Sequence, residues 1–250
     1  MHVRPVSPEA LVEELADLLA GSGDRARAAD ASARPDDRAR VADEVARPDA
    51  RARVADGTAR PDGPAGSVRV AIDGPPAARP EDLADALVGP LRLRGRPAVR
   101  IRTADFLRPA SLRFELGRTS PDAFYTAWVD EAGLRREVLD PAGPGGTGKI
   151  ITRLWNAETD RATREPYADL PAGAVVIVSG ALLLGAGLPF DVSVHLELSP
   201  AALARRTDPA EAWTLPAYAR YADEVDPASF ADVVVRMDHP ARPALVLDRF

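Results

Sequence analysis

Apolar and polar positions follow two different periods from residue 68 onward, and each period predicts one kind of element. Residues 68–73 form a short apolar run with β-branched side chains, typical of a strand, and end at the turn signal Gly74-Pro75. From Glu81 the apolar residues recur at helical intervals as far as Leu91. Further strands are predicted at 97–102, 174–178, 191–198 and 232–237, and further helices at 121–139, from 200, and at 215–224. This alternation predicts a three-layer α/β fold with a mainly parallel sheet.

The first 67 residues follow neither pattern for long. Residues 1–20 contain a helix that we expect to begin at Ser7-Pro8, to end at Gly21 and to dock on the body of the protein. Residues 21–67 carry a 13-residue repeat rich in Ala, Arg, Asp and Pro, seen in DRARVADEVARP. So little apolar area cannot offset chain entropy, so we interpret this segment as a mobile or loosely helical linker. Residues 68–250 then form the α/β domain.

Composition excludes several classes of function. The net charge of −6 argues against a nucleic-acid partner, and the absence of cysteine excludes disulfides and zinc–thiolate sites. The three histidines show no metal-ligand spacing, so no metal site is expected from them, and His195 is interpreted as a packed neutral ring. Residues 170–190 are uncharged, but their glycines and prolines favour a buried strand and loop over a membrane span. We expect a cytoplasmic protein without a membrane partner; its oligomeric state is not indicated.

The loop after residue 73 has the setting of a phosphate-binding loop with altered residues. The usual pattern is G-x-x-x-x-G-K-[ST], whereas Gly74 here begins G-P-P-A-A-R-P-E. Arg79 replaces the second glycine, so a left-handed backbone there would be strained. Pro80 replaces the lysine and lacks an N–H, and Glu81 replaces the hydroxyl residue with a negative charge.

The phrase VRVAIDGP-x-A-A followed by a helix resembles the uridine-kinase-like P-loop proteins of high-GC bacteria. The resemblance extends from Ser67 to the end of the chain and implies a P-loop kinase fold. In active relatives an acidic residue precedes the glycine after the most apolar strand and helps to hold Mg²⁺. Ser179 stands at that position here, so a second element of the metal–phosphate apparatus departs from the family pattern.

The resemblance also implies roles for individual residues. Asp105 matches the carboxylate that accepts a proton from the nucleoside hydroxyl, although it could equally cap a turn. Arg205 and Arg206 match lid arginines that clamp phosphates, or form a solvated basic turn. The remaining candidates, which would face a substrate cleft or form an ordinary basic loop with a core tyrosine, are Arg108, Arg118, Tyr125 and Arg153.

A second glycine-rich stretch, residues 143–149, fits most of the phosphate-loop pattern but lacks its context. A helix is predicted before it and a strand after it, the reverse of the strand–turn–helix order that a phosphate loop needs. We interpret it as an ordinary loop. Lys149 could still reach an anionic ligand.

Two functions follow. The favoured one is a non-catalytic binding or scaffold protein that keeps the kinase fold, has no required cofactor and does not bind ATP–Mg²⁺ productively. The alternative is a divergent nucleoside (uridine) kinase that uses ATP and Mg²⁺ and takes a small hydroxyl substrate. A nucleoside or nucleotide is the small-molecule partner expected in either case.

Overall fold

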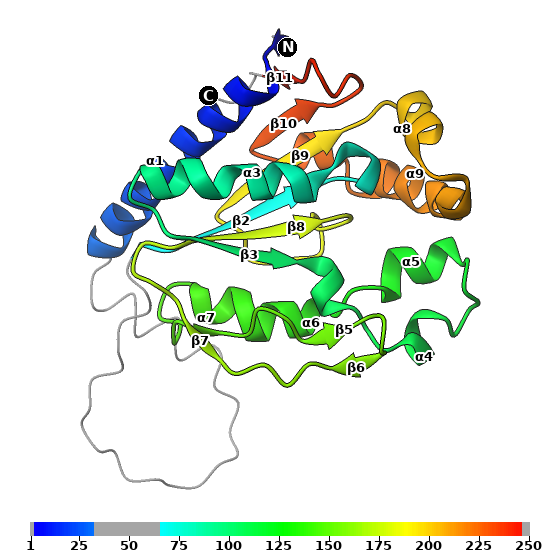
Figure 1. Cartoon of the computed structure of the whole chain (residues 1–250), viewed down its shortest axis with the longest axis horizontal. Helices are drawn as coiled ribbons and strands as arrows, with labels where there is room; N and C mark the ends of the chain where they lie inside the picture. Colours follow the sequence, from blue (N-terminus) through cyan, green and yellow to red (C-terminus); the bar gives the residue numbers. More distant parts are fainter. Residues whose placement is uncertain (1–2, 33–65, 247–250) are drawn as a thin grey trace, which may run out of the picture.

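The computed structural model describes residues 3–32 and 66–246, and side chains from residue 23 to 32 are left out of the description. Within these residues the main sheet has seven strands (Figure 1). Their spatial order is β1 (Val3–Pro5), β11 (Ala244–Val246), β10 (Val233–Arg236), β9 (Val192–Glu197), β2 (Val68–Asp73), β8 (Val175–Gly180) and β3 (Ala98–Arg102). The pairs from β10 to β3 are parallel, and β11 and β1 are added antiparallel at one edge.

Helices cover both faces of this sheet. The helices are α1 (Pro8–Ser32), α3 (Pro80–Leu93), α4 (Ala110–Arg113), α5 (Pro121–Ala127), α6 (Glu131–Leu134), α7 (Asp140–Ala142), α8 (Pro200–Arg206), α9 (Leu215–Glu224) and α10 (Pro227–Phe230). Figure 1 shows α1 and α3 on one face and α6 and α7 on the other, with α5, α8 and α9 gathered where the parallel strands end. The carboxyl edge of the sheet is therefore enclosed by helices from distant parts of the chain.

Shorter elements complete the fold. Two small sheets pair β4 (Lys149–Ile150) with β7 (Ala168–Asp169) and β5 (Trp155–Asn156) with β6 (Arg161–Ala162). The 3₁₀ segments are η1 (Pro76–Ala78), η2 (Thr103–Phe106) and η4 (Pro209–Thr214), and η3 (Arg135–Leu139) is a π-helix.

The central strands explain why the sheet is parallel. All six residues of β2 and all six of β8 are buried, which matches the continuous apolar runs of strands that are covered on both faces. One core cluster lies between the sheet and the α1–α3 layer, and includes Leu11, Leu15 and Leu87. The second lies on the opposite face and includes Leu134 and Val138. Two packed faces give the three-layer architecture predicted from the sequence.

Three local predictions are corrected. Helix α1 does not end at Gly21 but continues to Ser32, because a single glycine within a helix costs only about 1 kcal/mol relative to alanine. The predicted helix 121–139 is divided, because Val129 forms a bridge with Leu107. After η3 it also passes Asp140-Pro141 and ends only at Gly143.

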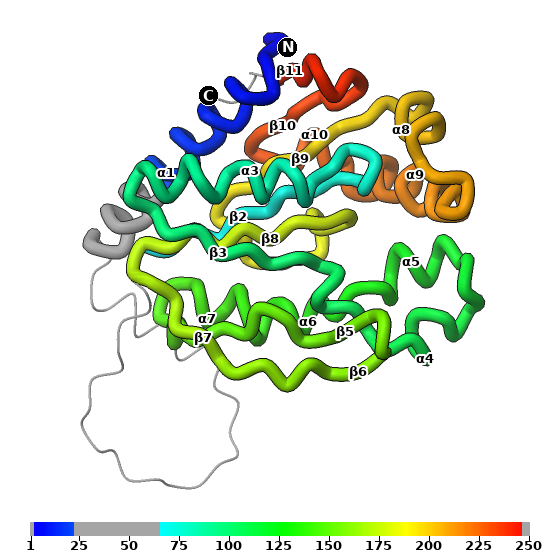
Figure 2. Tube along the Cα trace, in the orientation of Figure 1, coloured from blue at the N-terminus to red at the C-terminus, as the bar shows by residue number. Residues whose placement is uncertain are grey.

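Strand β1 was not predicted. It is three residues long and pairs with β11 from the other end of the chain, and Figure 2 shows the two running side by side. Of the predicted linker 21–67, residues 33–65 lie outside the described residues, and so does most of the repeat. Residues 170–190 form β8 and its flanking loops, as expected. Among the described helices, none has the length and apolar character needed to cross a bilayer.

Candidate functional site

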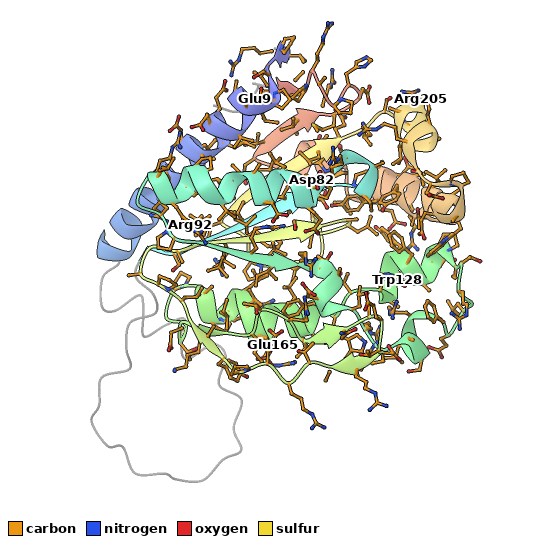
Figure 3. All side chains as sticks on the ribbon, in the orientation of Figure 1. Glu9, Asp82, Arg92, Trp128, Glu165 and Arg205 are labelled. Atoms are coloured by element: carbon orange, nitrogen blue, oxygen red, sulfur yellow. The ribbon has the colours of Figure 1, made fainter. Side chains whose placement is uncertain are left out.

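A cavity of about 530 Å³ lies at the carboxyl edge of the sheet, beside the loop between β2 and α3. One wall comes from this loop and the first turn of α3, and the other from α5 and the residues that follow it. Figure 3 labels one residue of each wall, Asp82 in α3 and Trp128 beside α5. Ligands of parallel α/β sheets bind in the crevice outside the strand ends. The position of the cavity therefore makes it the first candidate for a binding site.

Aromatic rings form much of the wall on the α5 side. Phe124, Trp128 and Tyr218 line the cavity, and the Phe124 ring meets Trp128 at 5.4 Å and Tyr218 at 5.7 Å between centroids, both edge to face. Trp213 packs behind them, 5.6 Å from Phe124. Burial raises the pKa of Tyr218, which keeps its phenol neutral. Such a wall suits a flat heterocyclic ring, which gains both burial and ring–ring contact.

The loop at the other wall uses most of its backbone donors internally. Across residues 74–81, three are prolines and have no N–H. The Gly74 N–H donates to the carbonyl of Gly180 at 3.0 Å. Ala78 and Arg79 donate to the carbonyls of Pro75 and Pro76, at 2.8 and 2.9 Å, which closes the 3₁₀ turn η1. Six of the eight positions thus have no backbone donor left to offer an anion.

Arg79 adopts the left-handed conformation, with φ of 63° and ψ of 52°. It occupies the position of the second glycine of the phosphate-loop pattern, so the backbone keeps the glycine geometry although the glycine is gone. Its side chain is largely exposed and forms an ion pair with Asp82. A left-handed residue with a Cβ costs roughly 1–2 kcal/mol.

Replacing Arg79 by glycine is therefore expected to stabilise the protein. The strain energy that is relieved is larger than the cost of the extra conformational entropy that glycine gives the unfolded chain, and the net gain in the free energy of unfolding is ~0.5 kcal/mol. The exposed ion pair contributes little. Urea unfolding measures the change. The matched control is Arg79→Ala, which removes the ion pair but keeps the strain and should not raise stability. A loss with Arg79→Gly of the same size as the alanine loss would contradict the prediction.

Glu81, at the start of α3, and Ser179, near the end of β8, contact each other. The Ser179 hydroxyl donates to Oε2 of Glu81 at 2.8 Å, and Arg100 donates from Nη2 to the same oxygen at 2.9 Å. Arg100 Nη1 also donates to the Ser179 hydroxyl at 3.1 Å. The Arg100 guanidinium therefore binds both the Glu81 carboxylate and the Ser179 hydroxyl. This network ties α3 to β3 and β8.

Comparisons with known proteins give the fold. No protein-family model matches the chain, and no curated protein matches it in sequence. Among solved structures, a possible uridine kinase from Bacillus stearothermophilus is similar with a TM-score of 0.55 and 18% identity, over 67% of this chain and 88% of that one. The chain has the P-loop kinase fold.

Two other structures resemble the chain less closely. A candidate fructose transport system kinase from Silicibacter sp. TM1040 has a TM-score of 0.43 and 23% identity, over 65% of this chain and 82% of that one. The YGR205w protein has a TM-score of 0.40 and 10% identity, over 68% and 84%.

In the P-loop kinase fold, ATP and Mg²⁺ would bind at the loop before α3, and the residues present do not fit them. The amides are largely used, Pro80 supplies no ammonium group, and Glu81 places a carboxylate beside the expected phosphates. The Glu81 and Ser179 oxygens that could approach a cation are bound to Arg100, whose side chain is 16% exposed. A polyanion would meet the Glu81 carboxylate here, and few free backbone donors.

Of the predicted catalytic and cleft residues, Tyr125 lines the cavity. Its hydroxyl donates to Glu224 at 3.1 Å, the Arg220 guanidinium lies 4.3 Å from its ring centroid, and burial raises its pKa. Asp105 does not line the cavity as described. Its carboxylate accepts from Arg102 at 2.9 Å and from Arg153 at 2.7 Å. The second bond joins Asp105 and Arg153, which were separate candidates in the sequence analysis.

The remaining basic candidates are not brought together, and none is among the residues that line the described cavities. The Arg118 guanidinium lies 5.1 Å from the Phe114 ring centroid at an exposed position. Arg205 and Arg206 donate to the carbonyls of Ala201 and Met237, and Figure 3 labels Arg205 on α8 at the periphery. Arg108 contributes its backbone, since its carbonyl accepts from Arg113 at 2.7 Å.

Residues 143–148 form a loop between α7 and β4, without the strand–turn–helix setting, and Lys149, the first residue of β4, pairs with Asp169 at 3.0 Å. Sequence reasoning missed Trp128, Tyr218 and Glu131 as cavity residues. Desolvation raises the pKa of Glu131. Sequence spacing predicts that a helix has a buried face, but it does not show which cavity that face borders.

Proposed function

We propose that this protein is a non-catalytic binding protein that accepts a nucleoside-like heterocycle in the cavity beside the altered loop. One observation carries the proposal: an aromatic-lined cavity of about 530 Å³ adjoins a phosphate loop whose backbone donors are already used. The rings favour a flat neutral ligand, and the loop offers a triphosphate few backbone donors. The cytoplasmic location expected from the sequence stays a prediction.

The expected result is stabilisation by uridine or another nucleoside and none by ATP–Mg²⁺. A ligand at 100 times its Kd would add about 2.7 kcal/mol, which for a domain of this size raises Tm by several degrees. Differential scanning fluorimetry with each ligand measures the shift. A comparable shift with ATP–Mg²⁺ alone would contradict the proposal.

Two tryptophan variants test whether the nucleoside binds in this cavity, and tryptophan fluorescence measures the binding. Trp128 lines the cavity, whereas Trp155 lies on β5 outside it. Trp128→Leu should abolish nucleoside binding, and the matched variant Trp155→Phe should leave it unchanged. Equal loss in both variants would locate the ligand elsewhere.

The alternative is a divergent nucleoside kinase with Asp105 as general base, and the similarity in fold to a possible uridine kinase favours keeping it under test. It expects ADP release from ATP–Mg²⁺ and uridine, abolished by Asp105→Asn. The two arginines around Asp105 weaken this alternative, because both oxygens of its carboxylate already accept hydrogen bonds from the protein, from Arg102 and from Arg153.

A loop variant separates the two functions. Arg79→Gly, Pro80→Lys and Glu81→Thr together restore the phosphate-loop residues and remove the carboxylate from the Arg100 network. We expect this variant to gain ATP–Mg²⁺ binding that the parent lacks. A parent protein that already turns over ATP would establish the alternative.

A further inference from the structure

A buried polar cluster lies beneath a second cavity, next to the first. The cavity of about 530 Å³ proposed for the nucleoside is called the nucleoside cavity below. Asp73, the last residue of β2, is fully buried. Its Oδ1 accepts from the Leu183 N–H at 2.9 Å, and its Oδ2 contacts Nδ1 of His195 at 2.7 Å and the Tyr221 hydroxyl at 3.1 Å. Burial, reinforced by nearby Asp73, raises the pKa of Tyr221, so its phenol stays protonated and donates to the carboxylate.

This cluster fixes the orientation of the His195 ring. Asp73 already accepts from the Leu183 amide and the Tyr221 hydroxyl, so we infer that Nδ1 is a further donor to it and that Nε2, on the far edge of the ring, is the acceptor. His195 is 7% exposed and lines a second cavity of about 510 Å³. The acceptor nitrogen is therefore held in place by the fold.

Because Nδ1 is turned toward Asp73, we infer that the far edge of the ring, which carries Nε2, borders that cavity. In the part of the chain that the structure describes, the hydrogen bond of His195 runs through Nδ1. A buried histidine nitrogen that faces an open cavity without a protein partner is arranged to accept a hydrogen bond from a ligand.

The lining of the second cavity selects the charge of that ligand. It includes three carboxylates, Glu197, Asp226 and Asp238, against one guanidinium, Arg236, which pairs with Glu197 at 2.9 Å. Most of the other lining side chains are apolar, Leu203 among them. Excess negative charge repels phosphates and carboxylates and attracts cations.

We propose that the cavity before His195 is a second small-molecule site that binds an organic ammonium ion, with His195 Nε2 as the acceptor. The ammonium donates to Nε2, Asp226 and Asp238 neutralise its charge, and the apolar walls take its hydrocarbon body. This site is separate from the proposed nucleoside site, although the two cavities share three lining residues, and it has the opposite charge preference from a nucleotide site.

Three matched probes test the charge preference: phenethylammonium, 2-phenylethanol and 3-phenylpropionate. Side-chain ¹H–¹⁵N NMR follows the histidine rings, and His2→Gln and His239→Gln assign His195 by elimination. Phenethylammonium should shift the Nε2 resonance of His195 saturably, with the alcohol weaker and the carboxylate at least about tenfold weaker. Absence of a saturable shift, or equal binding of the alcohol or carboxylate, overturns the proposal.

Isosteric variants test the site without disturbing the buried cluster. Asp226→Asn and Asp238→Asn keep their capping oxygens, and asparagine tolerates the left-handed backbone of residue 226. Each should weaken phenethylammonium by about threefold, while Asp82→Asn, in the nucleoside cavity, should not. Leu203→Trp fills the second cavity and should abolish the shift. Unchanged affinity in all the site variants would overturn the proposal.

Discussion

Asp73→Ala is expected to lower the free energy of unfolding by about 3–5 kcal/mol, the usual loss when one partner of a buried charged or hydrogen-bonded cluster is removed. The carboxylate is fully buried and receives donors from β9, α9 and the segment after β8. Its loss strands the Leu183 amide and the Nδ1–H of His195 in an apolar interior. Urea unfolding monitored by circular dichroism measures the change.

Two variants bracket this effect. Asp73→Asn keeps one acceptor and lets the histidine take its other tautomer, so a loss of about 1–2 kcal/mol is expected. The exposed carboxylate Asp85, which pairs with Arg100 at 2.7 Å, is the control, and Asp85→Ala should change stability by less than about 1 kcal/mol. Equal losses for Asp73→Ala and Asp85→Ala would show that the cluster does not hold the strands together.

Gly180→Ala is expected to cost about 3 kcal/mol, at the upper end of overpacking effects. A Cβ at residue 180 would lie 2.8 Å from the Cβ of Thr103, which is bonded to the backbone of η2 and cannot rotate away. The carbonyl of Gly180 also holds the Gly74 amide, and Gly180 and Thr103 both line the nucleoside cavity. The substitution should therefore weaken nucleoside binding as well as stability.

The same substitution at Gly89 should have the opposite sign. Gly89 lies within α3 and no atom approaches its would-be Cβ within 4 Å, so Gly89→Ala gains helix propensity of up to about 1 kcal/mol. Thermal unfolding of the two variants compares them directly. A stable Gly180→Ala protein would mean that Thr103 and β8 can separate without cost.

Much of the fold could be predicted because its main elements carry local signals. The bounds of α9 coincide with the predicted helix 215–224, and β2 with the predicted strand 68–73. Strand β1 carries no such signal: three residues become a strand only because β11 offers an edge. Likewise η3 accommodates Pro141 through π-type geometry that a simple rule about proline does not foresee.

The sites were less predictable than the fold. The changes at Arg79, Pro80 and Glu81 could be seen in the sequence, but their consequences depend on neighbours. Glu81 contacts Ser179, 98 residues away, and His195 contacts Asp73 across 122 residues. Sequence spacing cannot pair such residues, because the pairing follows from which strands lie side by side. The interpretation of His195 as a packed ring accordingly missed its bond to Asp73.

Gly74, Leu182 and Tyr218 face both cavities, so one thin partition separates the two proposed ligands. A ligand that moves these shared residues when it binds in one cavity changes the binding free energy of a ligand in the other cavity. Thermodynamic reciprocity then requires that each molecule change the affinity of the other by the same factor. Under the proposed function, the protein would in this way respond to the joint presence of two small molecules.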